Sequence, residues 1–311
     1  MQRTEHRRSI DAAIDDFASR HHGVFPRSEA LRLGASIRQI ESRLASGRWI
    51  GIHEEVYAVA GAPPTPRRSL IAACFAVGRD AFVSHGSAAR MWGLPGSDER
   101  VVEVTTRRWH RTRETSFVVH ESKRTDEADV RIVDSIRVAS AELTVMQLGA
   151  IRNPLVVEMA LDRALYLNLV TLASVRELVD RLGARGRNGV GVLRAILDDR
   201  SPGDRAPESP KETQLLRLLL ANGLPRPVAQ YEVRHHGRFV ARVDFAYPDE
   251  RIAIEYDSYE YHTGTVARDR DAVRRRALLG VDWRVVPVTN ADLRSGCVSV
   301  ATTIATELRR R

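Results

Sequence analysis

Cysteine is scarce in this sequence. The 311 residues contain two, Cys74 and Cys297, and neither has a CxxC partner. This count excludes a disulfide framework and a zinc site made of cysteines. Both thiols are predicted to be buried or incidental.

Long hydrophobic runs are absent as well. No stretch approaches the roughly 18 apolar residues that a transmembrane helix needs. The opening residues, MQRTEHRRSIDAAIDDF, lack the apolar core of a signal peptide. We therefore expect no membrane partner and a cytoplasmic location, including association with the nucleoid.

Lysine occurs only at Lys123 and Lys211, so arginine carries almost all of the positive charge. The net charge of +8 and the pI near 10.0 indicate a polyanionic partner, although a genomic preference for arginine explains part of the excess. The excess is concentrated in residues 67–113, which carry nine arginines against four acids. Within them TTRRWHRTR (105–113) suits phosphate contact and base stacking, or a solvated strand and loop.

Motifs of small-molecule enzymes are missing too. The sequence has no glycine-rich phosphate loop, GxSxG elbow or HExxH helix. His85, His110 and His120 are scattered along the chain, and each is predicted to be a cap, surface or core residue rather than a metal ligand.

The N-terminal 62 residues have the pattern of three short helices and a hairpin. Apolar periodicity predicts helices over 10–21, 26–34 and 35–47, and alternation predicts a two-stranded hairpin over 48–61. Ser36 is expected to cap the third helix, with Ile37, Ile40 and Leu44 facing inward. This order predicts a winged helix-turn-helix, whose recognition helix exposes Arg38, Gln39, Ser42 and Arg43 to DNA. A net charge of only +1 leaves protein contact open as an alternative.

The remaining chain divides at two proline-rich segments, PPTP (63–66) and SPGDRAPESP (201–210). We predict an α+β multidomain protein: a winged helix-turn-helix (1–62), an α+β connecting domain (63–200), a linker (201–210) and a C-terminal α/β domain (211–311). The last domain is expected to contain a mixed sheet flanked by helices.

Two C-terminal strand patterns, FVARVDFAYP and RIAIEYDS, carry acidic residues among apolar ones. Side chains alternate across a strand, so Glu255 and Asp257 share a face, and a short turn can bring Asp244 beside them. Carboxylates at this spacing repel one another unless a cation lies between them, and an oxygen-only set suits Mg²⁺ or Mn²⁺. Asp249 and Glu250 are assigned to the turn.

Further reactive groups follow the second strand. His262 is placed as a general acid or base, and TVARDRDAVRRRALLG predicts a helix with a basic side that includes Arg268 and Arg274. The alternative is that the carboxylates form ion pairs with these arginines.

Residues 208–296 resemble the PD-(D/E)xK nuclease superfamily. The resemblance lies in the pattern SPKE…VDFAYP…IAIEYD…YH…D…R…L…GVDWRVV…T…DL. Its finer pattern is similar to that of an uncharacterised bacterial family related to very-short-patch repair endonucleases. The resemblance implies a catalytic site made of Glu212, Asp244, Glu255, Asp257 and His262, with Asp244, Glu255 and Asp257 on the metal. Asp257 stands where the broader superfamily has lysine, and the related family commonly has aspartate there.

The N-terminal part resembles the AbiEi-type antitoxins of type IV toxin–antitoxin systems. The matching segments are FPRSEALRLGASIRQIESRLASGRWIGIHEEVYAVAG and, after it, SHGSAARMWGLPG. The resemblance implies a bacterial DNA-binding antitoxin, with a cognate toxin or a second copy of the chain as a further partner. Two functions follow: a Mg²⁺-dependent DNA endonuclease, or a non-catalytic antitoxin-like regulator with a degenerate nuclease fold. RNA is a third possible substrate.

Overall fold

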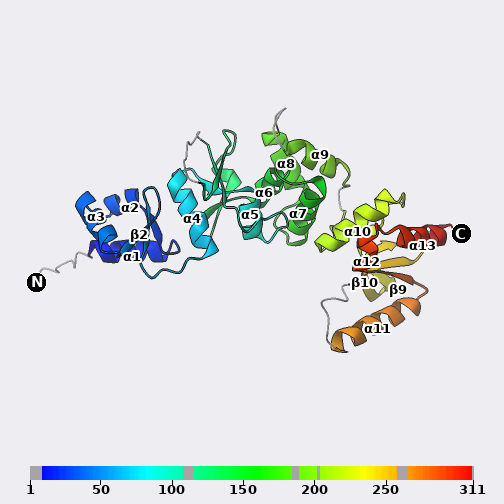
Figure 1. The fold of residues 1–311 in the computed structure, drawn as a ribbon. Helices are drawn as coiled ribbons and strands as arrows, with labels where there is room; N and C mark the ends of the chain where they lie inside the picture. Colours follow the sequence, from blue (N-terminus) through cyan, green and yellow to red (C-terminus); the bar gives the residue numbers. More distant parts are fainter. Residues whose placement is uncertain (1–8, 108–114, 184–188, 202–203, 258–264, 310–311) are drawn as a thin grey trace, which may run out of the picture. The chain divides into compact units, whose positions relative to one another are not determined.

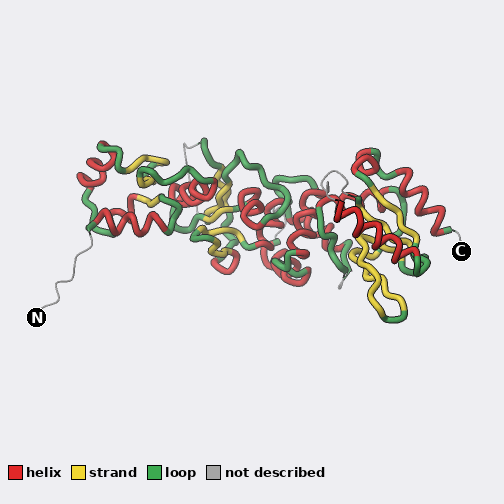
Figure 2. The backbone as a smooth tube through the Cα atoms, turned by 90° about the horizontal axis from the view of Figure 1, so that it is seen from below, coloured by secondary structure: helices red, strands yellow, loops and turns green. Residues whose placement is uncertain are grey.

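The computed structural model describes residues 9–107, 115–183, 189–201, 204–257 and 265–309, without the side chains of 265–271. Over these residues the fold is mixed α+β, as predicted, with 13 α-helices and three sheets. Figure 2 shows the strands in separate groups along the chain, with helices among them. The chain forms two compact units, residues 1–151 with 177–190, and residues 152–176 with 191–311.

The N-terminal part of the first unit has the predicted helices and hairpin (Figure 1). It also contains an additional short strand, β1, which pairs with the hairpin. Trp49 and Phe25 are its largest buried side chains. Ser36 caps the third helix within a capping box, as predicted, but Ile37 is 53% exposed, so its inward assignment is wrong. The elements are α1 (Ile10–Ser19), β1 (Val24–Pro26), α2 (Arg27–Arg32), α3 (Ile37–Ala45), β2 (Trp49–His53) and β3 (Val56–Val59), with sheet order β1-β3-β2.

The rest of the first unit contains a five-stranded sheet of order β6-β5-β4-β8-β7. Strands β7 and β8 are joined by a tight turn at Asp134 and Ser135, which have positive φ angles of 52° and 63°. The elements are α4 (Pro66–Val77), β4 (Phe82–Val83), α5 (His85–Trp92), β5 (Glu103–Thr106), β6 (Val118–Glu121), β7 (Val130–Val133), β8 (Ile136–Ala139) and α6 (Ala141–Leu148), with a short 3₁₀ turn, η1 (Glu127–Asp129), before β7.

The second unit contains the C-terminal sheet, of order β12-β11-β10-β9. β11 and β12 are parallel and the other pairs are antiparallel, so the sheet is mixed. Residues 201–210 lie within this unit. The elements are α7 (Pro154–Tyr166), α9 (Val190–Asp198), α10 (Pro210–Ala221), β9 (Val228–His235), β10 (Arg238–Tyr247), β11 (Ile252–Tyr256), α11 (Thr265–Leu279), β12 (Arg284–Val288), α12 (Asn290–Arg294) and α13 (Val298–Leu308), and α8 (Leu172–Leu182) belongs partly to each unit.

Two apolar clusters cover the two faces of the C-terminal sheet. Phe245 and Ile254 pack with α10, α12 and α13, whereas Ala246 and Ala253 pack with Leu278 of α11. Figure 1 shows α11 on one side of this sheet and α10, α12 and α13 on the other. Alanine at 246 and 253 keeps α11 close to the strands, so the neighbouring polar side chains of this face lie beneath a basic helix.

The helices that the structure describes include none with the length and hydrophobicity needed to span a membrane.

Candidate functional site

Asp244 and Glu255 lie on neighbouring antiparallel strands, β10 and β11. The register pairs Phe245 with Ile254 and Ala246 with Ala253. If this register continues by one residue beyond Phe245 and Ile254, Asp244 lies opposite Glu255 and the two side chains share a face. The Asp244 carboxylate accepts a hydrogen bond from the backbone N–H of Tyr256 at 2.8 Å, which ties it to the partner strand. Asp249 and Glu250 lie in the turn between these strands, as predicted.

Glu212 comes to the same site from the first turn of α10. Pro210 opens this helix and Ser209 caps it, a favourable start because the first N–H groups have no partner within the helix. The Glu212 carboxylate accepts hydrogen bonds from the N–H of Glu208 (2.8 Å), the hydroxyl of Ser209 (2.7 Å) and the amide of Gln230 (2.8 Å). Both carboxylate oxygens are therefore fixed in position.

Gln230 is a member of this site that the sequence analysis missed. The ladder between β9 and β10 pairs Tyr231 with Val243 and Ala229 with Phe245, so Gln230 lies across from Asp244. Gln230 has a φ of 50°, a left-handed conformation that is uncommon outside glycine, and it is buried. Backbone strain of this kind is concentrated at functional sites. No spacing rule predicts a single left-handed residue within a strand.

Burial and mutual repulsion perturb the acids of this site. Burial, followed by the charge of Asp244, raises the pKa of Glu212 to about 7. Burial also raises the pKa of Asp244, against the hydrogen bond from Tyr256 and the positive charge of Arg274, which both lower it. Carboxyl groups that are buried close together keep protons longer than exposed ones, and a bound cation relieves the same repulsion.

The raised pKa of Glu212 predicts that part of the stability decreases with increasing pH. The folded protein retains the Glu212 proton up to about pH 7, whereas an unfolded glutamate loses it near pH 4.3. The free energy of unfolding should therefore decrease by up to about 4 kcal/mol between those pH values and stay level above them. Urea unfolding from pH 4.5 to 8 measures this decrease. The Glu212→Gln variant should lose it and Glu250→Gln should retain it, and an unchanged pH slope in Glu212→Gln would contradict the assignment.

Two arginines of α11 pair with acids of this face. Arg274 lies 3.3 Å from the Glu255 carboxylate, and Arg275 lies 3.0 Å from that of Asp257. Both guanidinium groups are partly exposed. Among the described residues, Asp244, Glu255 and Asp257 do not form a group of three with ligand atoms within 4.8 Å of one another. The arrangement is a pair of opposed carboxylates, Asp244 and Glu255, with arginines beside them.

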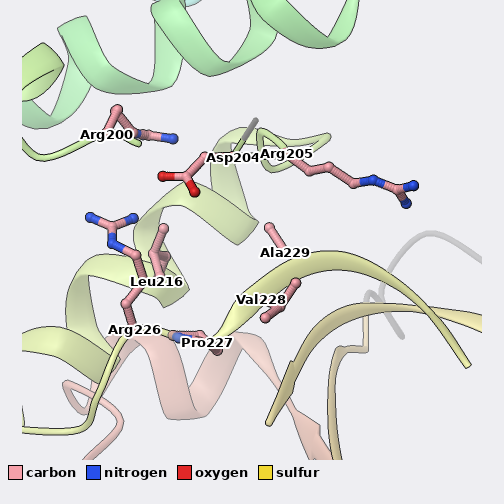
Figure 3. A pocket seen from close by; sticks show the side chains of 8 residues that line it. All are labelled: Arg200, Asp204, Arg205, Leu216, Arg226, Pro227, Val228 and Ala229. Carbon is pink, nitrogen blue, oxygen red and sulfur yellow. The ribbon is translucent and has the colours of Figure 1, made fainter. Parts of the chain in front are cut away.

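A pocket of about 310 Å³ lies close to the acidic site within the same unit. The guanidinium of Arg205 donates to the backbone oxygen of Gln230 at 2.7 Å, so the pocket and the acidic site have Gln230 as a common neighbour. Figure 3 shows the Arg205 side chain extending away from the other charged groups. The pocket is lined by Arg200, Asp204, Arg205, Leu216, Arg226, Pro227, Val228 and Ala229.

The predicted recognition helix, α3, has a mixed outer face. Arg43 donates to Asp11 and lies 5.3 Å from the centre of the Trp49 ring, and the Gln39 side chain accepts from the N–H of Ser36. These two residues therefore stabilise the module. Arg38 and Ser42 are exposed, and Arg38 forms no ion pair with the described residues. Arg38 is consequently the better candidate for contact with a ligand.

Some predicted site residues lie outside what the structure describes. His262 is outside the described residues, as is the segment 108–114, which contains most of the basic stretch at 105–113. Arg268 belongs to α11, but its side chain is not among those described. These assignments remain predictions.

His85 and His120, which are 35 residues apart in the sequence, come together in the first unit. With Glu103 they form a group whose possible ligand atoms all lie within 4.8 Å of one another. Both histidines were predicted to be cap, surface or core residues. Local spacing gives no sign of this group, because it joins the start of a helix to two strands.

No protein-family model matches this sequence. Two similar proteins occur in Mycobacterium tuberculosis, "Uncharacterized protein MT2308" of strain CDC 1551 and "Uncharacterized protein Rv2248" of strain H37Rv. Each is 28% identical over 273 residues, which cover 88% of this chain and 97% of the relative. The similarity therefore extends across both structural units.

Proposed function

We propose that this protein binds DNA and that its C-terminal unit hydrolyses phosphodiester bonds in DNA with Mg²⁺ or Mn²⁺. The proposal rests on one observation above all, the opposed carboxylates of Asp244 and Glu255, with Glu212 fixed close to Asp244. The N-terminal helices and hairpin act in this proposal as a winged helix-turn-helix that positions the chain on DNA. The resemblance of the C-terminal sequence to PD-(D/E)xK nucleases supports the same function.

The donor set fits a hard divalent cation. Mg²⁺ in proteins is commonly held by one or two carboxylates, with its remaining positions taken by water and substrate phosphate. Asp244 and Glu255 supply such a pair, and the raised pKa of Asp244 reflects a buried acid that a cation would stabilise in its charged form. When bound, Mg²⁺ stabilises the charge that develops on the phosphate and activates water.

The chain's own groups have separate tasks in this proposal. Glu212 is the group that accepts a proton from water, and Ser209 and Gln230 hold its carboxylate in place. Arg274 and Arg275 bind the phosphate oxygens once DNA is present, exchanging their carboxylate partners for phosphate. In the proposed set Asp257 is a further ligand or a water-positioning group, and His262 is the second acid or base.

The test is nicking of supercoiled plasmid by the full chain, with Mg²⁺ and separately with excess chelator. The expected result is conversion to open circles with Mg²⁺ and none with the chelator. A protein that nicks equally in both conditions, or in neither, would contradict a metal-dependent nuclease. A parallel gel shift on the same DNA shows whether binding itself needs the metal.

A second function is favoured by the ion pairs of Glu255 with Arg274 and Asp257 with Arg275. Such pairs would stabilise a nuclease fold that no longer cuts and serves for binding DNA, a cognate toxin or a second copy of the chain. This regulator, of the antitoxin type, predicts specific DNA binding that persists in chelator and no nicking with Mg²⁺. RNA as substrate is tested by replacing the plasmid with labelled RNA.

Both functions predict that Arg38 contributes to DNA affinity. The Arg38→Ala variant should bind DNA more weakly, and the slope of log affinity against log salt should fall by about 1, because one phosphate contact is lost. Arg32→Ala is the matched control, because Arg32 is exposed on the neighbouring helix α2 but is paired with Glu29. Fluorescence anisotropy at several salt concentrations measures both slopes. If Arg38→Ala and Arg32→Ala lose the same amount of DNA affinity, the result would argue against α3 as the DNA-contacting helix.

A further inference from the structure

Three potential metal ligands from different elements meet in the first unit. His85 opens α5, Glu103 opens β5, and His120 lies in β6. Their possible ligand atoms all lie within 4.8 Å of one another. His85 and Glu103 are buried, and the His120 side chain is 26% exposed, so the group is close to the surface on one side.

Both the carboxylate and the backbone of Glu103 are fixed by neighbouring groups. One carboxylate oxygen accepts from the N–H of Gly86 at 2.8 Å, and the other lies 3.2 Å from Nε2 of His120. The backbone N–H of Glu103 donates to the hydroxyl of Ser87 at 2.9 Å. A buried carboxylate fixed in this way is oriented before any ligand arrives, as metal ligands commonly are.

His85 is also fixed, and at some conformational cost. Its φ is 51°, in the left-handed region that residues other than glycine rarely adopt. Its N–H donates to the Gln147 side chain at 3.1 Å, and its Nδ1 lies 3.0 Å from the hydroxyl of Ser84. The ring stacks on that of His120 with centroids 3.6 Å apart. The stacking and the two hydrogen bonds therefore hold the His85 ring beside that of His120.

Thr105 adds an independent sign of a ligand. It is 1% exposed, and its hydroxyl has no hydrogen-bond partner in the described part of the chain. The parallel register of β5 and β6 pairs Thr105 with His120, and Glu103 lies two residues earlier on the same face. Buried hydroxyls normally have partners, so an unsatisfied one beside this group indicates room for a further polar atom.

We propose that His85, Glu103 and His120 bind one divalent transition-metal ion of the Zn²⁺ or Co²⁺ type, with Thr105 next to a metal-bound water. Two imidazoles and one carboxylate suit such ions, whereas Mg²⁺ prefers oxygen ligands alone. Metal–ligand bonds of about 2.0–2.1 Å in tetrahedral geometry place the ligand atoms roughly 3.3 Å apart. The present separations therefore need to close by no more than about 1.5 Å. The site is separate from the carboxylates of the C-terminal sheet and does not depend on the proposed nuclease activity.

The experiment is a Co²⁺ titration of the untagged full chain after treatment with chelator, followed by visible absorption. The expected result is one Co²⁺ per chain, with d–d bands that persist in a large excess of Mg²⁺. Absence of these bands, or their removal by Mg²⁺, would overturn the proposal. This arm needs no variant, so it stands whether or not the variants fold.

Variants locate the ion. His120→Ala and Glu103→Gln should each weaken Co²⁺ binding at least about 100-fold, because a ligand is lost. His22→Ala, which removes a histidine bonded to the Asp134 backbone elsewhere in the unit, and Asp244→Asn in the C-terminal sheet should retain the bands. Bands that survive in His120→Ala and Glu103→Gln, or that disappear in Asp244→Asn, would overturn the assignment of the ion to this group.

Discussion

Mg²⁺-dependent nicking of plasmid DNA should fall at least about 100-fold in the Asp244→Asn variant. Asparagine keeps the size of the side chain and an oxygen that can accept the N–H of Tyr256, but it removes the negative charge that attracts the cation. Metal-assisted stabilisation of a phosphoryl transition state contributes several kcal/mol, and each 1.36 kcal/mol is tenfold in rate. Initial rates of nicking at saturating Mg²⁺ measure the loss.

Asp249→Asn is the matched control, since Asp249 lies in the turn that follows the same strand. It should nick at the wild-type rate. Equal rates in wild type and Asp244→Asn would remove Asp244 from the catalytic set. Specific DNA binding without nicking in any of the three proteins would instead support the regulator.

The Arg200→Met variant should have a free energy of unfolding about 3–5 kcal/mol below that of the wild type. Arg200 is almost fully buried, and its guanidinium lies 2.7 Å from Glu158 and 2.8 Å from Asp162, two acids of α7 that are buried as well. Methionine fills similar space but leaves the Asp162 carboxylate without its cation, whereas Glu158 keeps its ion pair with Arg217. Breaking a buried ion pair from one side has this cost because a charge remains desolvated.

Chemical denaturation of the full chain at pH 8 and pH 5 measures this effect. The loss should be smaller at pH 5, since burial already raises the pKa of Asp162 to about 6 and an acid without its cation accepts a proton more readily. Arg234→Met is the control, because its pair with Glu232 is largely exposed and such pairs contribute about 0–1 kcal/mol. Equal destabilisation of the two variants would contradict a structural role for the buried pair.

Local pattern predicted the architecture well. Periodicity gave the helices of the N-terminal module, and Ser36 was correctly expected to cap α3. The alternation in FVARVDFAYP and RIAIEYDS predicted that Asp244 and Glu255 share a face, in agreement with the observed register. These predictions succeed because a helix cap and a strand face depend on residues close together in the sequence. The metal and catalytic roles of these acids remain predictions.

Other features of the site could not be obtained in this way. The inward assignment of Ile37 failed because one turn of periodic pattern does not define the edge of a buried stripe. Gln230 contacts Glu212 through a left-handed backbone conformation that its residue type does not favour. The sequence could have predicted the buried ion pairs of α7. Glu158 and Asp162 are four residues apart on a helix rich in apolar residues, and charges spaced in this way on a buried face need a partner.

Residues close together in the sequence were enough to predict most helices and strands and the acidic face of the C-terminal strands, and the cysteine count excluded a cysteine metal site. Packing brings together groups that are distant in the sequence: Glu212 with Asp244, Arg274 with Glu255, and His85 with Glu103 and His120. Secondary structure follows from neighbours along the chain, whereas the contacts of a site follow from how helices and strands pack across a sheet. Packing is also what desolvates Glu212 and moves its pKa to about 7.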